Sequence, residues 1–206
     1  KKKKMTDQKI EEIKQILEKE HDAEYFDVLD EKTLKPLRQE KRTIVHKNGL
    51  LHRSVNVIII DETNSVLLQH RSAAKKVQGN LWDLSCAEHL KVGESFFEAV
   101  PRGCLEELGL KVNKNQIQLL RDNHRHHYIE ESEKLNINDN EVVQTYLVKL
   151  QSTCRKQIKI DEKEVDKARW LSMEALKLEL KEQKNIYTTW GYDELVYFIN
   201  HYQNQS

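Results

Sequence analysis

The chain has 206 residues, enough for one domain with a sizeable hydrophobic core and a short helical appendage. Lys and Arg together number 34, as do Asp and Glu, so no net field favours nucleic acid or an anionic membrane. Charged residues make up 33% of the chain and hydrophobic residues 38%, which is typical of a soluble globular protein with a heavily charged surface.

The apolar runs and the cysteines bear on where the protein works. The longest apolar runs, such as 55–60, are too short to span a bilayer, and the basic residues 1–4 are not followed by the apolar core of a secretory signal. Cys86, Cys104 and Cys154 are an odd number without C-x-x-C spacing. They argue against a disulfide framework and predict an intracellular, reducing compartment, either the cytoplasm or an organelle matrix.

The N-terminal residues predict an amphipathic helix. Apolar side chains recur at helical spacing over residues 7–20, and Lys and Glu fill most of the remaining positions. We therefore expect residues 1–22 to form an N-terminal helix and residues 23–206 to form the main domain.

The rest of the chain mixes strand and helix patterns. The β-branched run 54–60 predicts a buried strand that pairs with 65–70 as a hairpin. Ser95 is a predicted N-cap of a helix that runs to Leu108 and stops at Gly109. The other expected elements are strands at 25–29, 37–43, 116–123, 141–150 and 167–171, a strand and loop at 81–90, a turn at Asn48-Gly49, and helices at 172–183 and 193–202. Without a regular βαβ rhythm, these elements predict an α+β sandwich, a sheet covered by helices.

The stretch 93–110 carries a dense group of functional side chains. Glu94, Glu106 and Glu107 lie on or beside the predicted helix, with Arg102 between them. Mg²⁺ commonly bridges protein carboxylates to phosphate oxygens, so this helix predicts a platform for a metal and a phosphate. On spacing alone, a solvated charged helix face is an equally good interpretation.

This stretch resembles the Nudix box, whose pattern is G-x5-E-x7-R-E-U-x-E-E-x-G-U with U an aliphatic residue. Aligned from its end, the matching residues are Glu94, Arg102, Glu106, Glu107, Gly109 and Leu110. Two positions depart from the pattern: Glu88 stands at the leading glycine, and Gly103 stands at the glutamate that follows the arginine. The chain is thus identified as a member of the Nudix superfamily with a degenerate box. The resemblance implies an α/β/α sandwich around a mixed sheet.

The flanking segments resemble the isopentenyl-diphosphate isomerase-like branch of that superfamily. The similar segments are 24–30, 46–53, 67–75, 81–85, 139–142 and 189–190. With the box, the resemblance implies a metal site whose ligands are His46, His52, His89, Glu106, Glu107, Asp139 and Glu141. It also implies that Arg71 and Lys75 bind phosphate oxygens, with Trp82 as a further substrate contact, although an exposed basic loop is the simpler interpretation.

The departures from the family pattern bear on activity. The isomerase needs an acid–base cysteine where this chain has Ala87, and Cys86, one residue earlier, is expected to face the other side of a strand. Gly103 offers no oxygen where hydrolases have a metal-binding carboxylate, and a lost acid or base costs ~10²–10⁴-fold in rate. Pro101 is expected to distort the box helix unless the helix begins there. Glu88 is expected either to repel a phosphate or to supply a replacement metal ligand.

Three functions follow from these patterns. The first is a hydrolase of a small-molecule diphosphate that uses Mg²⁺ or Mn²⁺, with Glu107, Glu141 and Arg102 as catalytic residues. The second is a weakened Nudix domain that has lost its cation and serves as a structural subunit of a larger protein complex. The third, disfavoured by Ala87, is an isopentenyl-diphosphate isomerase. No specific nucleic-acid partner is expected, since the basic cluster 124–127 is interpreted as a charged loop.

Overall fold

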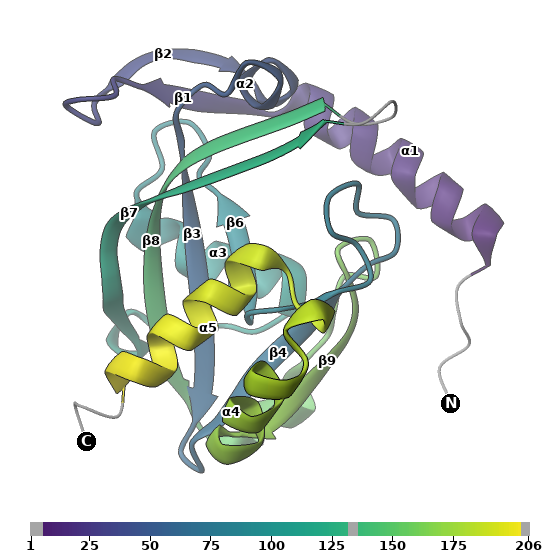
Figure 1. Cartoon of the computed structure of the whole chain (residues 1–206), viewed down its shortest axis with the longest axis vertical. Coiled ribbons are helices and arrows are strands. Elements are labelled where there is room, and N and C mark those ends of the chain that lie inside the picture. Colours follow the sequence, from purple (N-terminus) through teal and green to yellow (C-terminus); the bar gives the residue numbers. More distant parts are fainter. Residues whose placement is uncertain (1–5, 132–135, 203–206) are drawn as a thin grey trace.

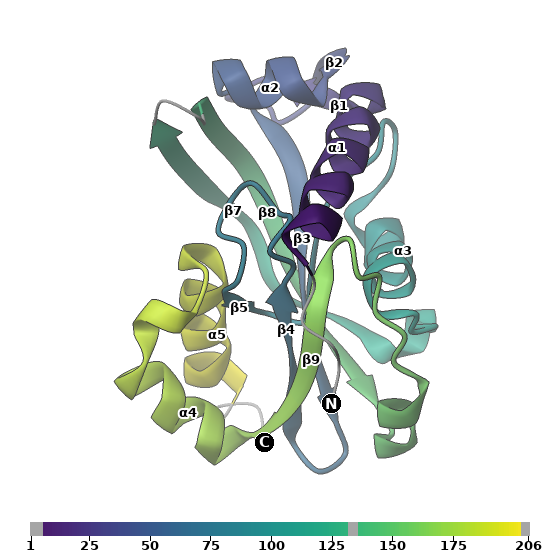
Figure 2. The same cartoon turned by 90° about the vertical axis from the view of Figure 1, so that its right-hand side faces the viewer.

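The computed structural model describes residues 6–131 and 136–202, so the basic residues 1–4 lie outside the described part. A central sheet lies between two helical layers (Figures 1 and 2). Helices α4 (Met173–Glu182) and α5 (Thr189–Tyr202) cover one face, and α3 (Phe96–Leu108) covers the other. The predicted α+β sandwich with a mixed sheet is confirmed.

The main sheet has the strand order β5-β4-β3-β8-β7, with β6 added to β3 and β9 added to β4. Its strands are β3 (His52–Asp61), β4 (Ser65–Arg71), β5 (Trp82–Asp83), β6 (Cys86–His89), β7 (Ile117–Glu131), β8 (Asn136–Leu150) and β9 (Val165–Ser172). Strands β3 and β8 run parallel, whereas the other named pairs of this sheet are antiparallel. The predicted hairpin of β3 and β4 is confirmed.

Strand β3 is buried on both faces because its apolar side chains alternate between the two helical layers. Val55, Val57 and Ile59 pack in the core beneath α3. Ile58 and Ile60 pack in the second core, which α4 and α5 cover. The period-2 alternation of strand side chains thus makes one β-branched run the centre of both cores.

Helix α3 begins and ends where the sequence predicts. Ser95 and Glu98 form a reciprocal capping box, and Gly109 ends the helix with φ +67°. The helix is continuous through Pro101, so the expected distortion is wrong. A proline inside a helix removes one backbone donor. The capping box and the buried inner face of α3 hold the helix together despite that loss.

The N-terminal part of the chain forms a separate layer around the top of the sheet (Figure 1). Helix α1 (Asp7–Ala23) buries Ile13 and Leu17 against Ala74 of the β4–β5 loop. Strands β1 (Tyr25–Leu29) and β2 (Pro36–Lys41) form their own two-stranded sheet. The 3₁₀ helices are η1 (Lys114–Gln116), η2 (Ser152–Gln157) and η3 (Lys184–Ile186).

Two segments differ from the sequence-based expectation. Residues around 42–48 form a short helix, α2 (Arg42–Asn48), and the predicted turn at Asn48-Gly49 is the end of that helix, where Gly49 has φ +62°. The basic cluster 124–127 belongs to β7 and pairs with β8, so its interpretation as a loop is wrong. Alternate side chains of this cluster point to opposite faces of the sheet, a pattern that its uniform basic character conceals.

The cysteines and the lengths of the helices bear on two further features of the sequence. Cys86, Cys104 and Cys154 are all free and buried. In the described part of the chain, each helix is too short or too polar to cross a membrane.

Candidate metal centre and phosphate-binding loop

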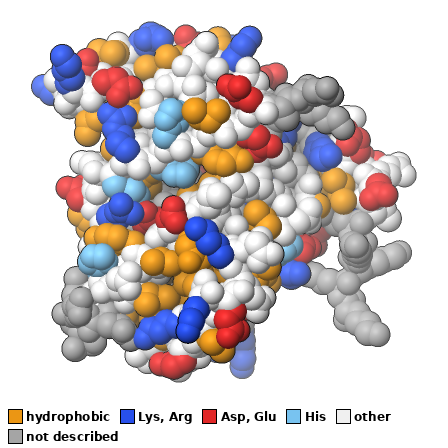
Figure 3. All heavy atoms as spheres, viewed as in Figure 1, with side chains coloured by type: hydrophobic (Ala, Val, Ile, Leu, Met, Phe, Trp, Pro, Cys, Tyr) orange, Lys and Arg blue, Asp and Glu red, His pale blue; other side chains and the backbone are white. Residues whose placement is uncertain are grey.

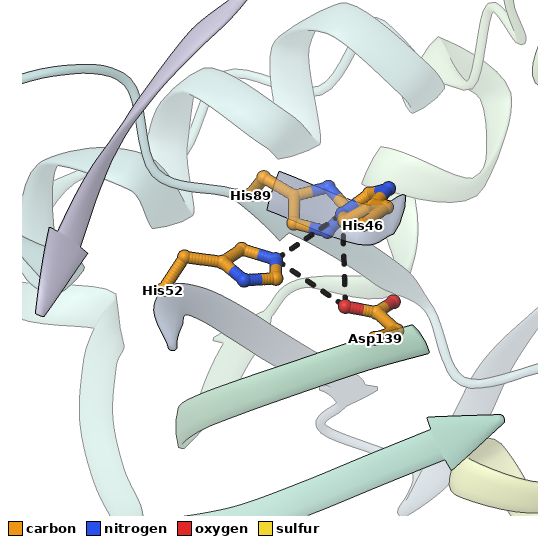
Figure 4. A group of neighbouring side chains, drawn as sticks. All are labelled: His46, His52, His89 and Asp139. Carbon is orange, nitrogen blue, oxygen red and sulfur yellow. Dashed lines mark hydrogen bonds and ion pairs between the residues drawn. The ribbon is translucent and has the colours of Figure 1, made fainter. Parts of the chain in front are cut away.

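A group of three histidines and one aspartate meets at the top of the sheet. His46 comes from α2, His52 from β3, His89 from β6 and Asp139 from β8, and their side chains point toward one another (Figure 4). Their ligand atoms all lie within 4.8 Å of one another. The Nε2 atoms of His46 and His52 are 3.2 Å apart. Glu141 borders the group, because its Oε1 lies 3.1 Å from Nε2 of His89. We call these five residues the histidine centre.

Strand register explains why residues distant in sequence meet here. In the parallel β3–β8 pair, His52 lies opposite Glu141, and in the antiparallel β3–β6 pair, Ser54 lies opposite His89. Side chains two residues apart share a face, so His52, Ser54 and their partners project from the same side of the sheet. Gly49 ends α2 in a left-handed conformation that brings the chain back from His46 to β3.

The histidine centre fits a divalent cation. Nε2 of His89 and Oδ1 of Asp139 are buried and make no hydrogen bond of good geometry, although Glu141 lies 3.1 Å from the first atom and His52 3.3 Å from the second. A bound ion would satisfy both atoms. The backbone carbonyl of Leu50 contacts Nδ1 of His52 at 2.9 Å, which leaves Nε2 of this fully buried ring facing the group. Imidazole nitrogens combined with carboxylate oxygens suit Mn²⁺, Zn²⁺ or a Mg²⁺-like ion.

The charges in the centre favour the ligating forms of most groups. Burial, followed by neighbouring positive groups, lowers the pKa of both His46 and His89, so both rings are neutral at pH 7. Burial raises the pKa of Asp139, but contacts with His52 and His46 outweigh it and hold that pKa well below its usual value. Burial and the nearby Asp139 raise the pKa of Glu141 to about 7. Glu141 is therefore able to exchange a proton near neutral pH.

The predicted phosphate-binding residues lie at the end of β4 and on the β4–β5 loop that follows it. Arg71 ends β4, donates from Nη2 to the Val77 carbonyl at 3.1 Å, and lies 3.5 Å from the Asp83 carboxylate. Lys75 forms an ion pair with Glu164. Burial raises the pKa of Glu164, but Lys75 outweighs this effect and lowers it to about 2. Both cations are thus held by protein carboxylates.

The tryptophan that lies over Arg71 is Trp190, whereas Trp82, predicted as a substrate contact, lies elsewhere. The Arg71 guanidinium is 5.2 Å from the Trp190 ring centre, and Nε1 of Trp190 donates to Asp83 at 2.9 Å. Trp82 instead packs against His70 and beneath the guanidinium of Arg169, 3.7 Å from its ring centre. The structure does not bring Trp82 to the face of the guanidinium of Arg71.

Two residues of β7, His126 and Tyr128, pack against Trp190, and we call these three rings the aromatic wall. Neither β7 residue was among the predicted site residues. The rings of His126 and Tyr128 lie 5.9 and 5.8 Å from that of Trp190. His126 also lies opposite Glu141 in the β7–β8 register, which links the wall to the histidine centre. In Figure 3, histidine side chains lie along the side of the molecule that β7 occupies in Figure 1. The alternation of His124, His126 and Tyr128 was the sequence signal for a strand here.

The Nudix-type box forms a separate network around Arg102. Arg102 binds both oxygens of Glu94 at 2.8 and 2.9 Å, and its Nη1 donates to Glu88 at 3.0 Å and to Glu106 at 2.8 Å. Glu106 is exposed and also pairs with Lys91, so the structure does not bring it into the histidine centre. Arg102 has no donor left over for a substrate beyond these contacts and the His89 carbonyl, to which Nη2 donates at 2.8 Å.

Glu107 differs from the other box carboxylates because it is buried on the inner face of α3. Only 5% of this residue is exposed, and its Oε2 is buried without a hydrogen-bond partner. Burial, and next the charge of Glu88, raise the pKa of Glu107 well above its usual value. A cation or a proton is therefore needed to stabilise this side chain.

The cysteines lie on the wrong side of the sheet for isomerase chemistry. Cys86 packs beneath α3 with Cys104 and Cys154, whereas Ala87 faces the opposite core. The orientation expected for Cys86 is therefore confirmed. All three cysteines of the chain belong to the α3 side, away from the layer that contains Ala87.

Comparisons with known proteins agree on one family. The model of the NUDIX domain matches residues 50–190 of this chain. An isopentenyl-diphosphate Δ-isomerase of Serratia proteamaculans is 37% identical over 78 residues, which are 38% of this chain and 44% of that protein. Nudix hydrolase 3 of Arabidopsis thaliana is 36% identical over 96 residues, which are 46% of this chain and 12% of that protein. These matches span less than half of either relative.

Longer but weaker similarities cover most of the chain. An isopentenyl-diphosphate Δ-isomerase of Photobacterium profundum is 27% identical over 183 residues, which are 86% of this chain and 96% of that protein. A crystal structure from Deinococcus radiodurans has a TM-score of 0.61 at 18% identity and covers 87% of this chain and 99% of that one. A MutT protein structure from Methanosarcina mazei has a TM-score of 0.54 at 18% identity, over 76% of this chain and 96% of that one.

The family match covers the strands and the helix that build the Arg102 network and, except for His46 on α2, the histidine centre. The chain belongs to the Nudix family.

Proposed function

We propose that this protein hydrolyses a diphosphate-containing small molecule with the help of Mg²⁺ or Mn²⁺. The observation that carries the proposal is the histidine centre, in which buried ligand atoms of His89 and Asp139 make no hydrogen bond of good geometry. The aromatic wall and the cations of the β4–β5 loop support the substrate class, because Arg and Lys bind phosphate oxygens.

The chain's own residues have separable tasks in this scheme. A bound divalent cation would polarise a phosphoryl oxygen and lower the pKa of a water molecule. His46, His52, His89 and Asp139 would hold that cation. Arg71 and Lys75 would hold the diphosphate, Lys75 by exchanging its contact with Glu164 for phosphate oxygens. Glu141, whose pKa is raised to about 7, would accept a proton at a carboxylate oxygen as a general base.

A binding role without turnover is the second candidate. Gly103 favours it, because the box lacks the carboxylate that family hydrolases have at that position, and Arg102 is fully engaged by the protein itself. In this case the domain would bind a diphosphate, or would serve as a subunit of a larger protein complex, without hydrolysing anything.

Phosphate release from a panel of nucleoside and isoprenoid diphosphates, with Mg²⁺ or Mn²⁺, separates the two candidates. The hydrolase proposal expects release that disappears in Glu107→Gln and after chelation of the cation. Binding of a panel member without release above the Glu107→Gln control would support the second candidate. Absence of both release and cation-dependent binding across the panel would overturn the substrate class.

A further inference from the structure

The two departures from the Nudix box are in direct contact. An ideal Cβ placed on Gly103 would lie 2.5 Å from Cγ of Glu88 and 2.8 Å from Sγ of Cys86. Both distances are far shorter than real contacts, so Glu88 occupies the space in which any side chain at position 103 would begin. The glutamate at position 88 and the glycine at position 103 are therefore one structural feature, in which the observed position of Glu88 requires a glycine at 103.

The position of Glu88 brings its side chain to the face of α3 that carries the buried glutamate of the box. Residues 103 and 107 are four apart on α3 and share its inner face. Glu88 reaches that face from β6 at Gly103, one helical turn from Glu107. The Oε2 atom of Glu107 is buried and has no hydrogen-bond partner.

The charges around this point leave a negative excess. Arg71 is offset by Asp83 and Lys75 by Glu164, one carboxylate for each cation. Two further cations, Arg102 and Lys91, pair with three carboxylates, those of Glu88, Glu94 and Glu106, and Glu107 is a fourth carboxylate that pairs with neither. When all of them are ionised, an excess of two negative charges remains, which matches the charge of one divalent cation.

We propose that Glu88 supplies from β6 the cation-binding carboxylate that Gly103 does not supply from α3, and that Glu88 and Glu107 together bind a divalent cation separate from that of the histidine centre. The proposal deepens the proposed function and rests on it, since it restores to the box the metal-binding carboxylate that Gly103 removed. A simpler role for Glu88 is that of counter-ion to Arg102. Arg102, however, already binds Glu94 through two nitrogens, and this role leaves the buried Oε2 of Glu107 without a partner.

Titration of the full chain with Mn²⁺, followed by the electron paramagnetic resonance of the free ion, counts the bound cations. We expect two classes of site in the native protein. Glu88→Gln, which keeps an oxygen for Arg102, should weaken one class by ~10–100-fold and spare the other. Asp139→Asn should weaken Mn²⁺ binding by the other class, the site in the histidine centre. Glu179→Gln is the matched control, because Glu179 is a half-buried carboxylate that also pairs with an arginine, Arg169, but on the α4 side of the molecule.

Exchange of the two residues is the decisive experiment. Glu88→Gly should lose the class of Mn²⁺ site that depends on Glu88. Adding Gly103→Glu should raise the Mn²⁺ affinity of that class about tenfold or more, because the carboxylate then comes from α3. Thermal unfolding without metal checks that each variant is folded. If the double variant does not fold, Cys86→Ala removes the remaining 2.8 Å contact. The proposal is overturned if Glu88→Gln binds Mn²⁺ like the native protein, or if the folded double variant binds no better than Glu88→Gly.

These outcomes are distinguishable from failure of the proposed function. Two classes of Mn²⁺ site, one dependent on Glu88, without release of phosphate from any diphosphate, would leave the proposal standing and remove the hydrolase activity. Hydrolysis that persists together with unchanged Mn²⁺ binding in Glu88→Gln would do the reverse.

Discussion

The histidine centre and the Arg102 network lie on opposite faces of β6. They differ in how far the protein itself satisfies their polar and charged atoms. In the histidine centre, buried atoms of His89 and Asp139 make no hydrogen bond of good geometry. In the Arg102 network, the guanidinium is bonded to Glu88, Glu94 and Glu106 at once. The first arrangement is incomplete without a ligand, whereas the second is largely satisfied by the protein itself.

This difference shows that residues retained from a sequence motif can stabilise the fold or can bind a ligand. The box keeps Glu94, Arg102, Glu106 and Glu107, but three of these four residues bind one another and stabilise the junction of α3 with β6. Only Glu107 retains a buried, unpartnered oxygen. Matching residues in a sequence pattern therefore indicate the fold, while unsatisfied buried atoms indicate where a ligand binds.

Asp139→Asn is expected to have the largest effect, a loss of cation binding at the histidine centre and not at the Arg102 network. The change keeps the shape of the side chain but removes the charge that faces His46 and His52. Mn²⁺ binding at the histidine centre should weaken by ~100-fold or more, as measured by calorimetric titration. Asp122→Asn on the exposed part of β7 is the control and should bind like the native protein. Equal binding by Asp139→Asn would show that the histidine centre does not hold the ion.

Arg71→Met should weaken the binding of a diphosphate with little effect on the metal. Met retains an apolar stem against Trp190 but loses the donors of the guanidinium. Since a hydrogen bond to a charged group contributes about 1.5–3 kcal/mol, binding of a non-hydrolysable diphosphonate should weaken by ~10–100-fold. Arg125→Met, at an exposed arginine that pairs with Glu31, is the control. A diphosphonate affinity unchanged in Arg71→Met would remove the β4–β5 loop from the site.

Gly103→Ala tests whether the box has been rebuilt around Glu88. In the native background the added Cβ meets Glu88 and Cys86, and overpacking costs of about 1–3 kcal/mol exceed the gain of about 1 kcal/mol in helix propensity. Chemical denaturation should therefore show a free energy of unfolding lower by about 1 kcal/mol. In a Glu88→Gly background only the contact with Cys86 remains, so the same change should cost less. Equal effects in the two backgrounds would mean that the residues are not coupled.

Removing the charge of Glu164 should have the smallest effect, a decrease in the free energy of unfolding that depends on pH. Burial raises its pKa, but Lys75 outweighs burial and lowers it from 4.5 to about 2. A depressed folded-state pKa contributes stability above pH 4.5 that is lost as the pH falls toward about 2. Because the side chain is partly exposed, the contribution is about 1 kcal/mol. The difference in unfolding free energy between native protein and Glu164→Gln should vanish between pH 5 and pH 2; a difference that is constant with pH would argue against this ion pair.

Much of the fold followed from local patterns in the sequence. Ser95, the apolar positions of α3 and Gly109 determine the ends of that helix through capping and periodicity, which act within a few residues. The short helix α2 was missed, because a helix of seven residues depends on tertiary packing, here of Val45 and His46, and not on propensity.

The candidate site was harder to predict, because it depends on strand register. The residues of the histidine centre were named from family resemblance, and only the pairings of β3 with β6 and β8 bring them together. The contact of Trp190 with Arg71 was not predicted for the same reason, since nothing in the sequence states that α5 begins over the end of β4. The contact of Glu88 with Gly103 likewise joins a strand to a helix 15 residues later.

Anomalous diffraction from crystals grown with Mn²⁺ tests the central claim most directly. The histidine centre predicts a manganese peak enclosed by His46, His52, His89 and Asp139, at about 2.0–2.3 Å from the ligating nitrogens and oxygens. The same peak should be absent in Asp139→Asn crystals grown in parallel. Native crystals that show no peak among these four side chains at saturating Mn²⁺ would contradict the account.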